Sequence, residues 1–361
     1  MIYQVIEYLE KIAPTCYQES YDNSGLLVGD ANAVLKKGLI CLDVTQAVMD
    51  EAVNTGCNLI VSHHPLIFNP LKKITGNSLC EKLIIQAIKN DIVIYAVHTN
   101  LDNVLYGVNQ RFAEKIGLKN TQILQPTQNN LYKLITYIPE KYADSVRESL
   151  FEAGAGEIGN YSSCSYNVEG YGTFKANGGA NPFVGSKKEV HQEKEIRTEV
   201  ISPVHLKSKV ISTLLKNHPY EEPAFDIIPL ANTNKTIGAG MIGELEVPMN
   251  EMDFLHFLKK QLQLSCIKHS KLCGKQIKTV ALCGGSGSFL IKNAVKQKAD
   301  IFISSELKHN HFVEASGAIL LTDIGHFESE IQTKFLLYDI LIKKFSTFAV
   351  SINEDNPILY L

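Results

Sequence analysis

Residues 58–68 have the sequence NLIVSHHPLIF, in which a short apolar run leads directly into two adjacent histidines. Two runs of the same kind occur nearby, GLICLDV (38–44) and IVIYAVH (92–98). Residues 46–55 and 78–90, between these runs, have the spacing of amphipathic helices. Short apolar runs that alternate with helices of this length are typical of βαβ units with buried, largely parallel strands.

The alternation of strands and helices stops at about Gln125 and resumes from Ile242. Between these points the order is strand, helix, strands, helix, strand, which is the pattern of a ferredoxin-like α+β module. A Gly-, Asn- and Ser-rich tract at 154–186 is expected to form loops or a hairpin within it. The pattern predicts an α/β fold class, with one α/β body formed by residues 1–125 and 236–361 and a module inserted at 126–235.

The composition is that of an ordinary globular protein, with 45% hydrophobic and 20% charged residues among 361. A formal charge of −3 and the absence of Trp disfavour a nucleic-acid partner. The first 14 residues, MIYQVIEYLEKIAP, are typical of an amphipathic helix and not of a signal peptide. No apolar run is long enough to span a bilayer. We therefore expect a cytoplasmic protein with no membrane partner.

The eight cysteines are widely spaced, and no pair has the C-x-x-C spacing of a zinc knuckle or a redox motif. Several lie within apolar strand or helix patterns, where a free thiol behaves as a small hydrophobic group. We interpret them as reduced cysteines of a protein core.

Histidines and carboxylates that could bind a metal or transfer a proton lie where the predicted strands end. These residues are His63, His64, His98, Asp102, His326 and Glu330. Functional groups in open α/β sheets collect at the carboxyl ends of strands, so segments distant in sequence can meet in one cleft. His326 and Glu330, four residues apart, share one face of a helix.

Imidazole and carboxylate ligands suit zinc, iron or manganese and need no thiolate. Adjacent histidines point in different directions, so His63 and His64 can each serve a separate ion. A carboxylate such as Glu330 can bridge two ions about 3.5–4 Å apart. This arrangement places Asp102 on one ion and His326 on the other. The alternative is structural, because Asp102 and Asn103 can cap a turn and Glu330 can stabilise the first turn of its helix.

Four motifs, in this order, make the chain resemble the Nif-three-like family, whose bacterial members are often labelled GTP cyclohydrolase 1 type 2 homologues. They are SYDNSGLLVG (20–29), SHHPLIF (62–68), HTNLDN (98–103) and GHFESE (325–330). The segment ending in HPYEEPAFDIIPL (218–230) is similar to the PII/CutA-like module of the longer members. The resemblance covers nearly the whole chain.

The resemblance implies a dinuclear metal centre with two divalent ions per subunit, zinc first and iron or manganese as alternatives. Its ligands would be His63, His64, Asp102, His326 and Glu330. It also implies a ring-like homohexamer whose sites face an internal cavity. The chain departs from the family at Tyr21, where Trp is common, and at Ser305, where a glycine is usual. The second departure puts a close backbone approach at that position in doubt.

Other candidates are weaker. His98 could act as a proton shuttle or could be a buried structural histidine. His309 matches a family position and is a candidate for substrate contact, although it and His311 could simply begin a helix. The glycine-rich GGSGS (284–288) is favoured as a tight turn over a phosphate loop, since it lacks the Lys-Ser/Thr of a P-loop. His218, with the two glutamates that follow it, is interpreted as part of a solvated loop.

Two functions follow from these residues. The first is a metal-dependent hydrolase that acts on an unknown small molecule, such as a nucleotide or phosphoester, through metal-bound hydroxide. In it Glu330 and His98 would be the catalytic residues. The second is a metal-binding or regulatory oligomer without turnover, in which the inserted module mediates contacts between subunits or responds to a small molecule.

Overall fold

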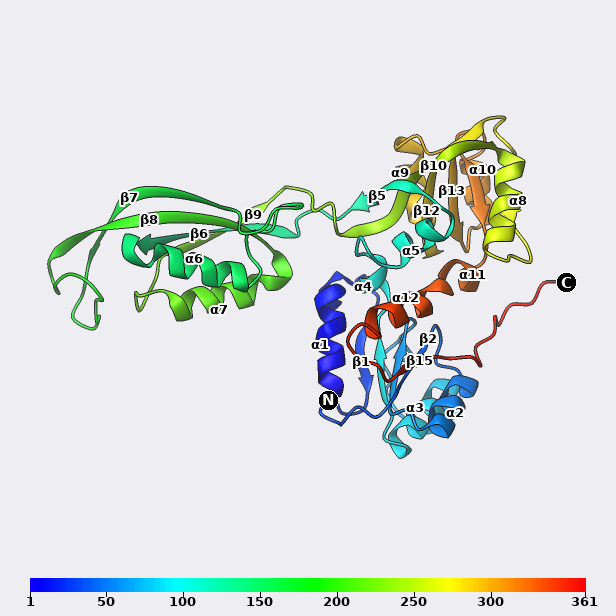
Figure 1. Ribbon diagram of the computed structural model, residues 1–361, viewed down its shortest axis with the longest axis horizontal. Helices are drawn as coiled ribbons and strands as arrows, with labels where there is room; N and C mark the ends of the chain where they lie inside the picture. Colours follow the sequence, from blue (N-terminus) through cyan, green and yellow to red (C-terminus); the bar gives the residue numbers. More distant parts are fainter. The chain divides into compact units, whose positions relative to one another are not determined.

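The computed structural model describes every residue from 1 to 361 and divides into two compact units. One unit combines both ends of the chain, Met1–Pro126 and Lys235–Leu361, and the other is Thr127–Asn234. The first unit contains two sheets and the second contains one (Figure 1). The chain is therefore a mixed α/β protein with three sheets.

The first sheet has five strands. In spatial order they are β1 (Gly25–Val28), β4 (Val93–Ala96), β3 (Leu59–Ser62), β2 (Gly38–Cys41) and β15 (Phe348–Val350). All are parallel except β1, which is antiparallel to β4. The three apolar runs of the sequence analysis thus form the parallel centre of this sheet. The edge strands β1 and β15 were not predicted, because neither has a distinctive apolar run.

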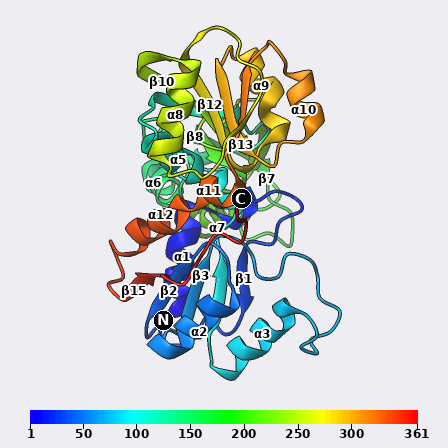
Figure 2. The same cartoon turned by 90° about the vertical axis from the view of Figure 1, so that its right-hand side faces the viewer.

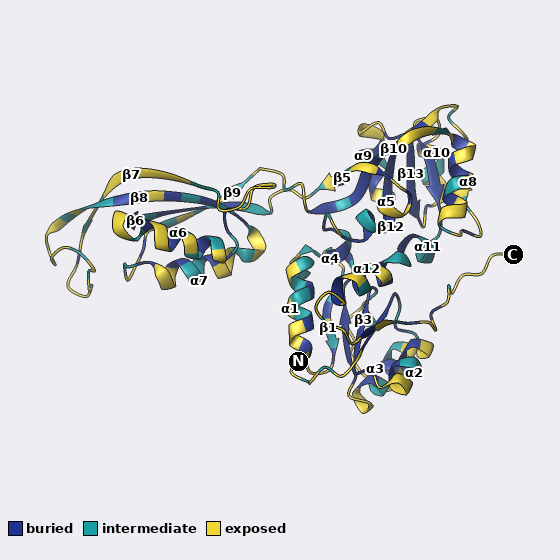
Figure 3. Cartoon of the chain, in the orientation of Figure 1, coloured by how far each residue is buried: buried dark blue, intermediate teal, exposed yellow.

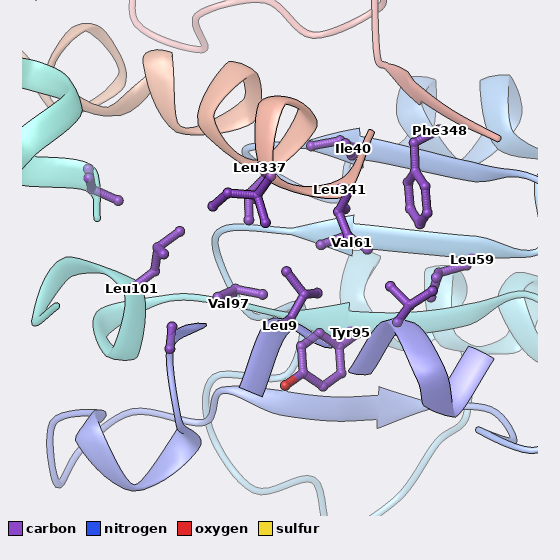
Figure 4. Close-up of a cluster of buried hydrophobic side chains, with 14 of the residues drawn as sticks. Leu9, Ile40, Leu59, Val61, Tyr95, Val97, Leu101, Leu337, Leu341 and Phe348 are labelled. Atoms are coloured by element: carbon purple, nitrogen blue, oxygen red, sulfur yellow. The ribbon is translucent and has the colours of Figure 1, made fainter. Parts of the chain in front are cut away.

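Every residue of β2, β3 and β4 is buried, because helices cover both faces of this sheet. On one face, Leu9 of α1 (Ile2–Ile12) and Leu337 and Leu341 of α12 (Gln332–Leu341) pack with Val61 and Tyr95 of the strands (Figure 4). The alternate strand residues pack against α2 (Gln46–Thr55) and α3 (Leu79–Lys89). Each fully buried large aliphatic side chain contributes about 1.5–3 kcal/mol to this core.

Side-chain caps begin the two helices on that second face. Thr45 Oγ1 accepts a hydrogen bond from Val48 N, and Ser78 Oγ accepts one from Glu81 N, each at 3.2 Å. These bonds satisfy backbone donors that have no partner within the first helical turn.

The second sheet has six strands. In spatial order they are β11 (Lys268–His269), β14 (Leu320–Asp323), β13 (Ile301–Ser305), β12 (Gln276–Ser286), β10 (Gly238–Asn250) and β5 (Lys119–Pro126). The central strands β12, β13 and β14 are parallel, and the others are antiparallel to their neighbours. The α/β body therefore has two separate sheets, which the sequence pattern did not distinguish.

The remaining helices of the first unit lie around the second sheet and between the two sheets (Figures 1 and 2). They are α4 (Thr99–Asp102), α5 (Val108–Lys115), α8 (Glu251–Gln261), α9 (Ile291–Lys296), α10 (His309–Glu314) and α11 (His326–Glu330), with the short 3-10 helices η1 (Thr15–Tyr17) and η4 (Ser288–Leu290). The pattern at 328–345 predicts one long helix, but the structure has two, α11 and α12, with Ile331 between them.

The second unit is a four-stranded antiparallel sheet with both of its long helices on one face. Its strands, in spatial order, are β7 (Ser165–Lys175), β8 (Val190–Pro203), β6 (Leu131–Pro139) and β9 (Phe225–Leu230). Its helices are α6 (Ala143–Glu152) and α7 (Lys207–Asn217), with the 3-10 helices η2 (Glu140–Tyr142) and η3 (Val204–Leu206). The Gly-rich tract contains β7, which forms a hairpin with β8 and is largely exposed (Figure 3).

All eight cysteines are free thiols, but only Cys41, Cys57 and Cys283 are buried. The expectation of core cysteines is therefore correct for those three, while Cys16 and Cys266 are exposed. None of the helices combines the length and the hydrophobicity needed to traverse a lipid bilayer.

Candidate metal centre

The structure brings together the five residues that the sequence analysis selected as ligands. His63 and His64 follow β3, Asp102 ends α4 just beyond β4, and His326 and Glu330 are the first and last residues of α11. His64, Asp102, His326 and Glu330 line a cavity of about 390 Å³, and His63 is completely buried. Helix α11 lies between the two sheets of the unit (Figure 2), so ligands from both sheets meet here.

Glu330 occupies the centre of the cluster and is only 2% exposed. One carboxylate oxygen, Oε2, lies 2.9 Å from His64 Nε2 and 2.9 Å from His326 Nε2. The other oxygen, Oε1, lies 3.9 Å from His63 Nε2. Glu330 is the last residue of α11, and α12 begins two residues later.

Two buried polar atoms beside Glu330 have no hydrogen-bond partner in the protein, His63 Nε2 and Asp102 Oδ1. They lie 3.7 Å apart. His63 Nδ1 lies 2.8 Å from Val97 O, and a carbonyl oxygen can only accept, so Nδ1 carries the proton. In the neutral ring Nε2 is then an acceptor that faces a carboxylate oxygen. Buried acceptors that face each other need a cation between them.

His64 is held in the same way, because its Nδ1 lies 2.8 Å from Asp43 Oδ1. His326 Nδ1 has a longer contact, 3.3 Å from Glu306 Oε1. Ligand histidines commonly donate their second N–H to a carboxylate or carbonyl, which fixes the ring and directs the free nitrogen at the metal. In this site all the free nitrogens are Nε2, and they point at Glu330.

His98 lies beside the cluster, with its ring centroid 5.2 Å from that of His63 and 5.4 Å from that of His64. Its Nδ1 lies 2.7 Å from Oδ1 of Asp22, whose other oxygen accepts from Thr99 N. The hydrogen bond with His98 helps to hold the pKa of Asp22 well below its usual range, although burial opposes this shift. Asp22 therefore stays charged and orients the His98 ring, which lines the cavity.

Burial and contacts within the cluster shift the pKa values of its residues strongly. Burial lowers the pKa of His64, but hydrogen bonds with Asp43 and Glu330 outweigh burial and raise it to about 10. Burial, and then the charge of Glu330, raise the pKa of Asp102. Burial also acts to raise the pKa of Glu330, but its contacts with the histidines hold it well below the ordinary value. The raised pKa values favour the protonated forms of His64 and Asp102.

The backbone at the C-terminal end of β12 turns at a glycine that lies directly against Glu330. At Gly285, where φ is +63°, an added Cβ would lie 2.3 Å from Glu330 Oε1. The turn is pinned because Gly285 O accepts from Ser304 Oγ at 3.0 Å and from Ser305 Oγ at 2.6 Å, while Gly285 N donates to Ser329 Oγ. The Ser305 side chain thus ties the turn, and the backbone that closely approaches Glu330 is that of Gly285.

The donor atoms fit a divalent cation. Three groups of residues have ligand atoms within 4.8 Å of one another, namely His63, His64 and His98; His64, His326 and Glu330; and His63, Asp102 and Glu330. Imidazole nitrogen and carboxylate oxygen are ligands for zinc, iron and manganese. These residues could therefore hold a metal ion.

Sequence reasoning missed Asp43 and Asp22, which orient His64 and His98. Asp43 lies two residues after the end of β2, so the strand-end argument applied to the other residues would have selected it. Asp22 lies within SYDNSGLLVG, but only its side-chain contacts identify its role.

The weaker candidates have local roles. His309 and His311 begin α10, where His311 Nδ1 accepts from Lys308 N, and His309 is exposed and does not line the cavity. The interpretation of His218 as part of a solvated loop is wrong. His218 is 6% exposed, and its ring bonds Tyr137 O and Tyr220 N.

Comparison with known proteins gives full-length matches. Its relatives include proteins named GTP cyclohydrolase 1 type 2 homolog. The one from Halalkalibacterium halodurans is 40% identical over 325 residues, covering 89% of this chain and 87% of its own length. The one from Bacillus subtilis is 36% identical over 368 residues, covering 99% and 98%. A solved structure described as a Bacillus cereus protein related to NIF3 has a TM-score of 0.87 at 35% identity, covering 100% of this chain and 99% of its own.

The family description Duf34/NIF3 (NGG1p interacting factor 3) matches residues 1–357. The family match and the full-length relatives cover both the α/β body and the second unit. The chain belongs to the Duf34/NIF3 family.

Proposed function

We propose that this chain binds two divalent metal ions at His63, His64, Asp102, His326 and Glu330, and that it is a metal-dependent hydrolase of a nucleotide or another phosphoester. Zinc is the first choice of metal, and iron and manganese are the alternatives. The names of the relatives, GTP cyclohydrolase 1 type 2 homolog, favour a nucleotide over other small molecules.

One observation carries the proposal: the two carboxylate oxygens of Glu330 face different partners. Oε2 lies 2.9 Å from both His64 Nε2 and His326 Nε2. Oε1 faces the partnerless pair of His63 Nε2 and Asp102 Oδ1. Each set has two further donors, so Glu330 would bridge two ions, each of which keeps open positions.

Divalent ions at such a site lower the pKa of water and polarise a phosphoryl or carbonyl oxygen. Asp43 keeps the His64 ring oriented. His98, held at Nδ1 by Asp22, has its other ring nitrogen available to take a proton from the reacting group. In this proposal Glu330 and His98 are the catalytic residues.

The cavity also has an aromatic side that suits a planar base. Tyr21 and Phe68 line it, with ring centroids 6.4 Å apart, and Phe68 lies 6.3 Å from the ring of His98. Both rings are partly exposed, at 62% and 43%, so they are free to stack on a ligand. An aromatic wall beside a metal pair favours a nucleotide among phosphoesters.

The test measures metal content and hydrolysis together. The zinc-, manganese- and iron-loaded protein is assayed on nucleoside triphosphates and phosphoesters, beside Glu330→Gln, His63→Ala and His326→Ala. The control is His256→Ala, at an exposed histidine of α8. We expect two ions per chain and turnover in the wild type and the control, with both reduced in the site variants. Unchanged metal content in the site variants would refute the ligand set.

The second candidate is a metal-binding or regulatory assembly without turnover. Its support is the second unit, whose strand order β7-β8-β6-β9 and one-sided helices have the βαββαβ arrangement of a ferredoxin-like module. We propose that it is a PII/CutA-like insertion between two halves of the Nif-three-like domain, and that the chain forms a ring-like hexamer. Two bound ions with no hydrolysis of any substrate favour this candidate. Light scattering tests the hexamer.

A further inference from the structure

The second unit has its own cavity, of about 470 Å³, which lies wholly within Thr127–Asn234. Glu195 of β8 lines it. Its neighbour Ile196 packs into the core with α6 and α7, and successive side chains of a strand point to opposite faces. The cavity therefore lies on the sheet face that those helices leave open.

Glu195 is an unusual residue for a cavity wall, because it is only 8% exposed and has no Lys or Arg partner. Its Oε1 accepts a hydrogen bond of 2.8 Å from Tyr220 OH, and no donor of the protein bonds Oε2. Burial raises the pKa of this carboxyl group. Buried carboxylates are normally paired with a cation, and Glu195 has no such partner within the protein.

The strand beside Glu195 makes room for its carboxylate. Gly172 of β7 faces it, and an added Cβ at Gly172 would lie 2.1 Å from Glu195 Oε2. Any side chain at position 172 would displace this oxygen. The lack of a side chain at Gly172 therefore leaves space for the carboxylate in the wall of the cavity.

Three aromatic rings complete the wall. The ring centroids of Phe174 and Phe183 lie 6.0 Å and 6.4 Å from that of Tyr220. The loop that carries Tyr220 is fixed by the buried His218, which bonds Tyr137 O through Nε2 and accepts from Tyr220 N through Nδ1. Tyr220, and through its hydrogen bond the Glu195 carboxylate, are therefore held in place before any ligand arrives.

The charge of the lining is negative. Glu195, Glu221 and Glu222 face a single cation, Lys175. The three carboxylates do not converge on one point as metal ligands do. A carboxylate-rich wall with aromatic faces suits a cation that carries N–H donors, since a charge-assisted hydrogen bond and cation–π attraction act together there.

We propose that this cavity binds a small organic cation, a guanidinium or ammonium group on a flat apolar frame. The N–H groups donate to Glu195 Oε2, and the frame lies against Phe174, Phe183 and Tyr220. This site is independent of the candidate metal centre.

The test is calorimetric titration of the full chain with phenylguanidine, a flat cation, and with phenylurea, its uncharged isostere. We expect saturable binding of phenylguanidine and at least about tenfold weaker binding of phenylurea, because the charge-assisted hydrogen bond is lost. In Glu195→Gln the amide still accepts from Tyr220, and phenylguanidine affinity falls by at least about tenfold. The matched control is Glu148→Gln, which removes the same charge from an exposed position on α6 and leaves binding unchanged.

Two further variants keep the test decisive if Glu195→Gln does not fold. Gly172→Ala retains the carboxylate but displaces Oε2, and Phe183→Ala truncates a ring that is 48% exposed. Both weaken binding of phenylguanidine. The proposal is overturned if the wild type shows no saturable binding, if phenylurea binds equally well, or if folded variants bind like the wild type.

Discussion

Replacing Gly285 with Ala tests the candidate metal centre from the backbone side, without removing any ligand. The added Cβ would lie 2.3 Å from Glu330 Oε1, whereas ordinary contacts begin at 3.4 Å. Either the turn or the carboxylate must move by about 1 Å, and metal–ligand distances tolerate only about 0.2 Å.

The structure indicates that both sides share this displacement. Three hydrogen bonds hold Gly285, from Ser304 and Ser305 to its carbonyl and from its N–H to Ser329. At about 1 kcal/mol each, moving the turn costs about 3 kcal/mol. Rotating the Glu330 side chain costs about 0.5–1.5 kcal/mol for an off-rotamer angle and also loosens its contacts with His64 and His326. Neither side is free to take up the whole displacement, so the carboxylate moves in part and both proposed ions lose the geometry of their shared ligand.

We expect metal affinity to fall by at least about 100-fold, since loss of an outer contact alone costs about 10–100-fold. The assay is zinc titration against a competing chelator, with metal content measured on the purified protein. The matched control is Gly317→Ala, whose φ is +77° and whose added Cβ meets nothing within 4 Å. Both variants lose about 1–2 kcal/mol of stability from the left-handed backbone conformation. The reasoning fails if Gly285→Ala binds zinc as tightly as Gly317→Ala.

Three further predictions concern the same unit. Asp43→Asn weakens zinc binding by about 10–100-fold, because His64 loses its orienting carboxylate; an unchanged affinity in the chelator assay would contradict this. The raised pKa of His64, about 10, keeps that ring protonated at pH 7 when no metal is bound. Zinc must then displace the proton, so affinity rises with pH below that value by about tenfold per unit for each proton released. Calorimetry in two buffers of different ionisation enthalpy checks this, and equal heats in both would refute it. Lys334→Met leaves the buried Glu354 carboxylate without its cation, 3.3 Å away, and lowers the free energy of unfolding by about 3–5 kcal/mol in urea titrations. Adding Glu354→Gln recovers part of that loss, and no recovery would show that the pairing is not the cause.

Much of the fold could be predicted from local patterns. The apolar runs at 38–44, 58–62 and 92–98 form β2, β3 and β4, because complete burial in a parallel sheet leaves a continuous apolar signature. The edge strands β1 and β15 carry no such signature, since they are partly exposed. The break at Ile331 was also invisible, because its flanking residues suit a helix on either side.

The site divides in the same way. The strand-end rule selected His63, Asp102 and the His326 segment, because a strand's end is a property of local sequence. It could not show that Glu330 directs its two oxygens at different partners, nor that Gly285 lies against it. Those contacts join residues that are far apart in the sequence. His64 and Glu330, for example, are 266 positions apart.

The two apolar-flanked histidines at 63–64 and the buried strand before them follow from the sequence alone, because alternation and burial act over a few residues. The tertiary structure alone decided that two sheets, and not one, supply the site. It also decided that the inserted unit has a carboxylate-lined cavity of its own. Such convergence depends on the packing of distant segments, and no short stretch of sequence carries the signal of that packing.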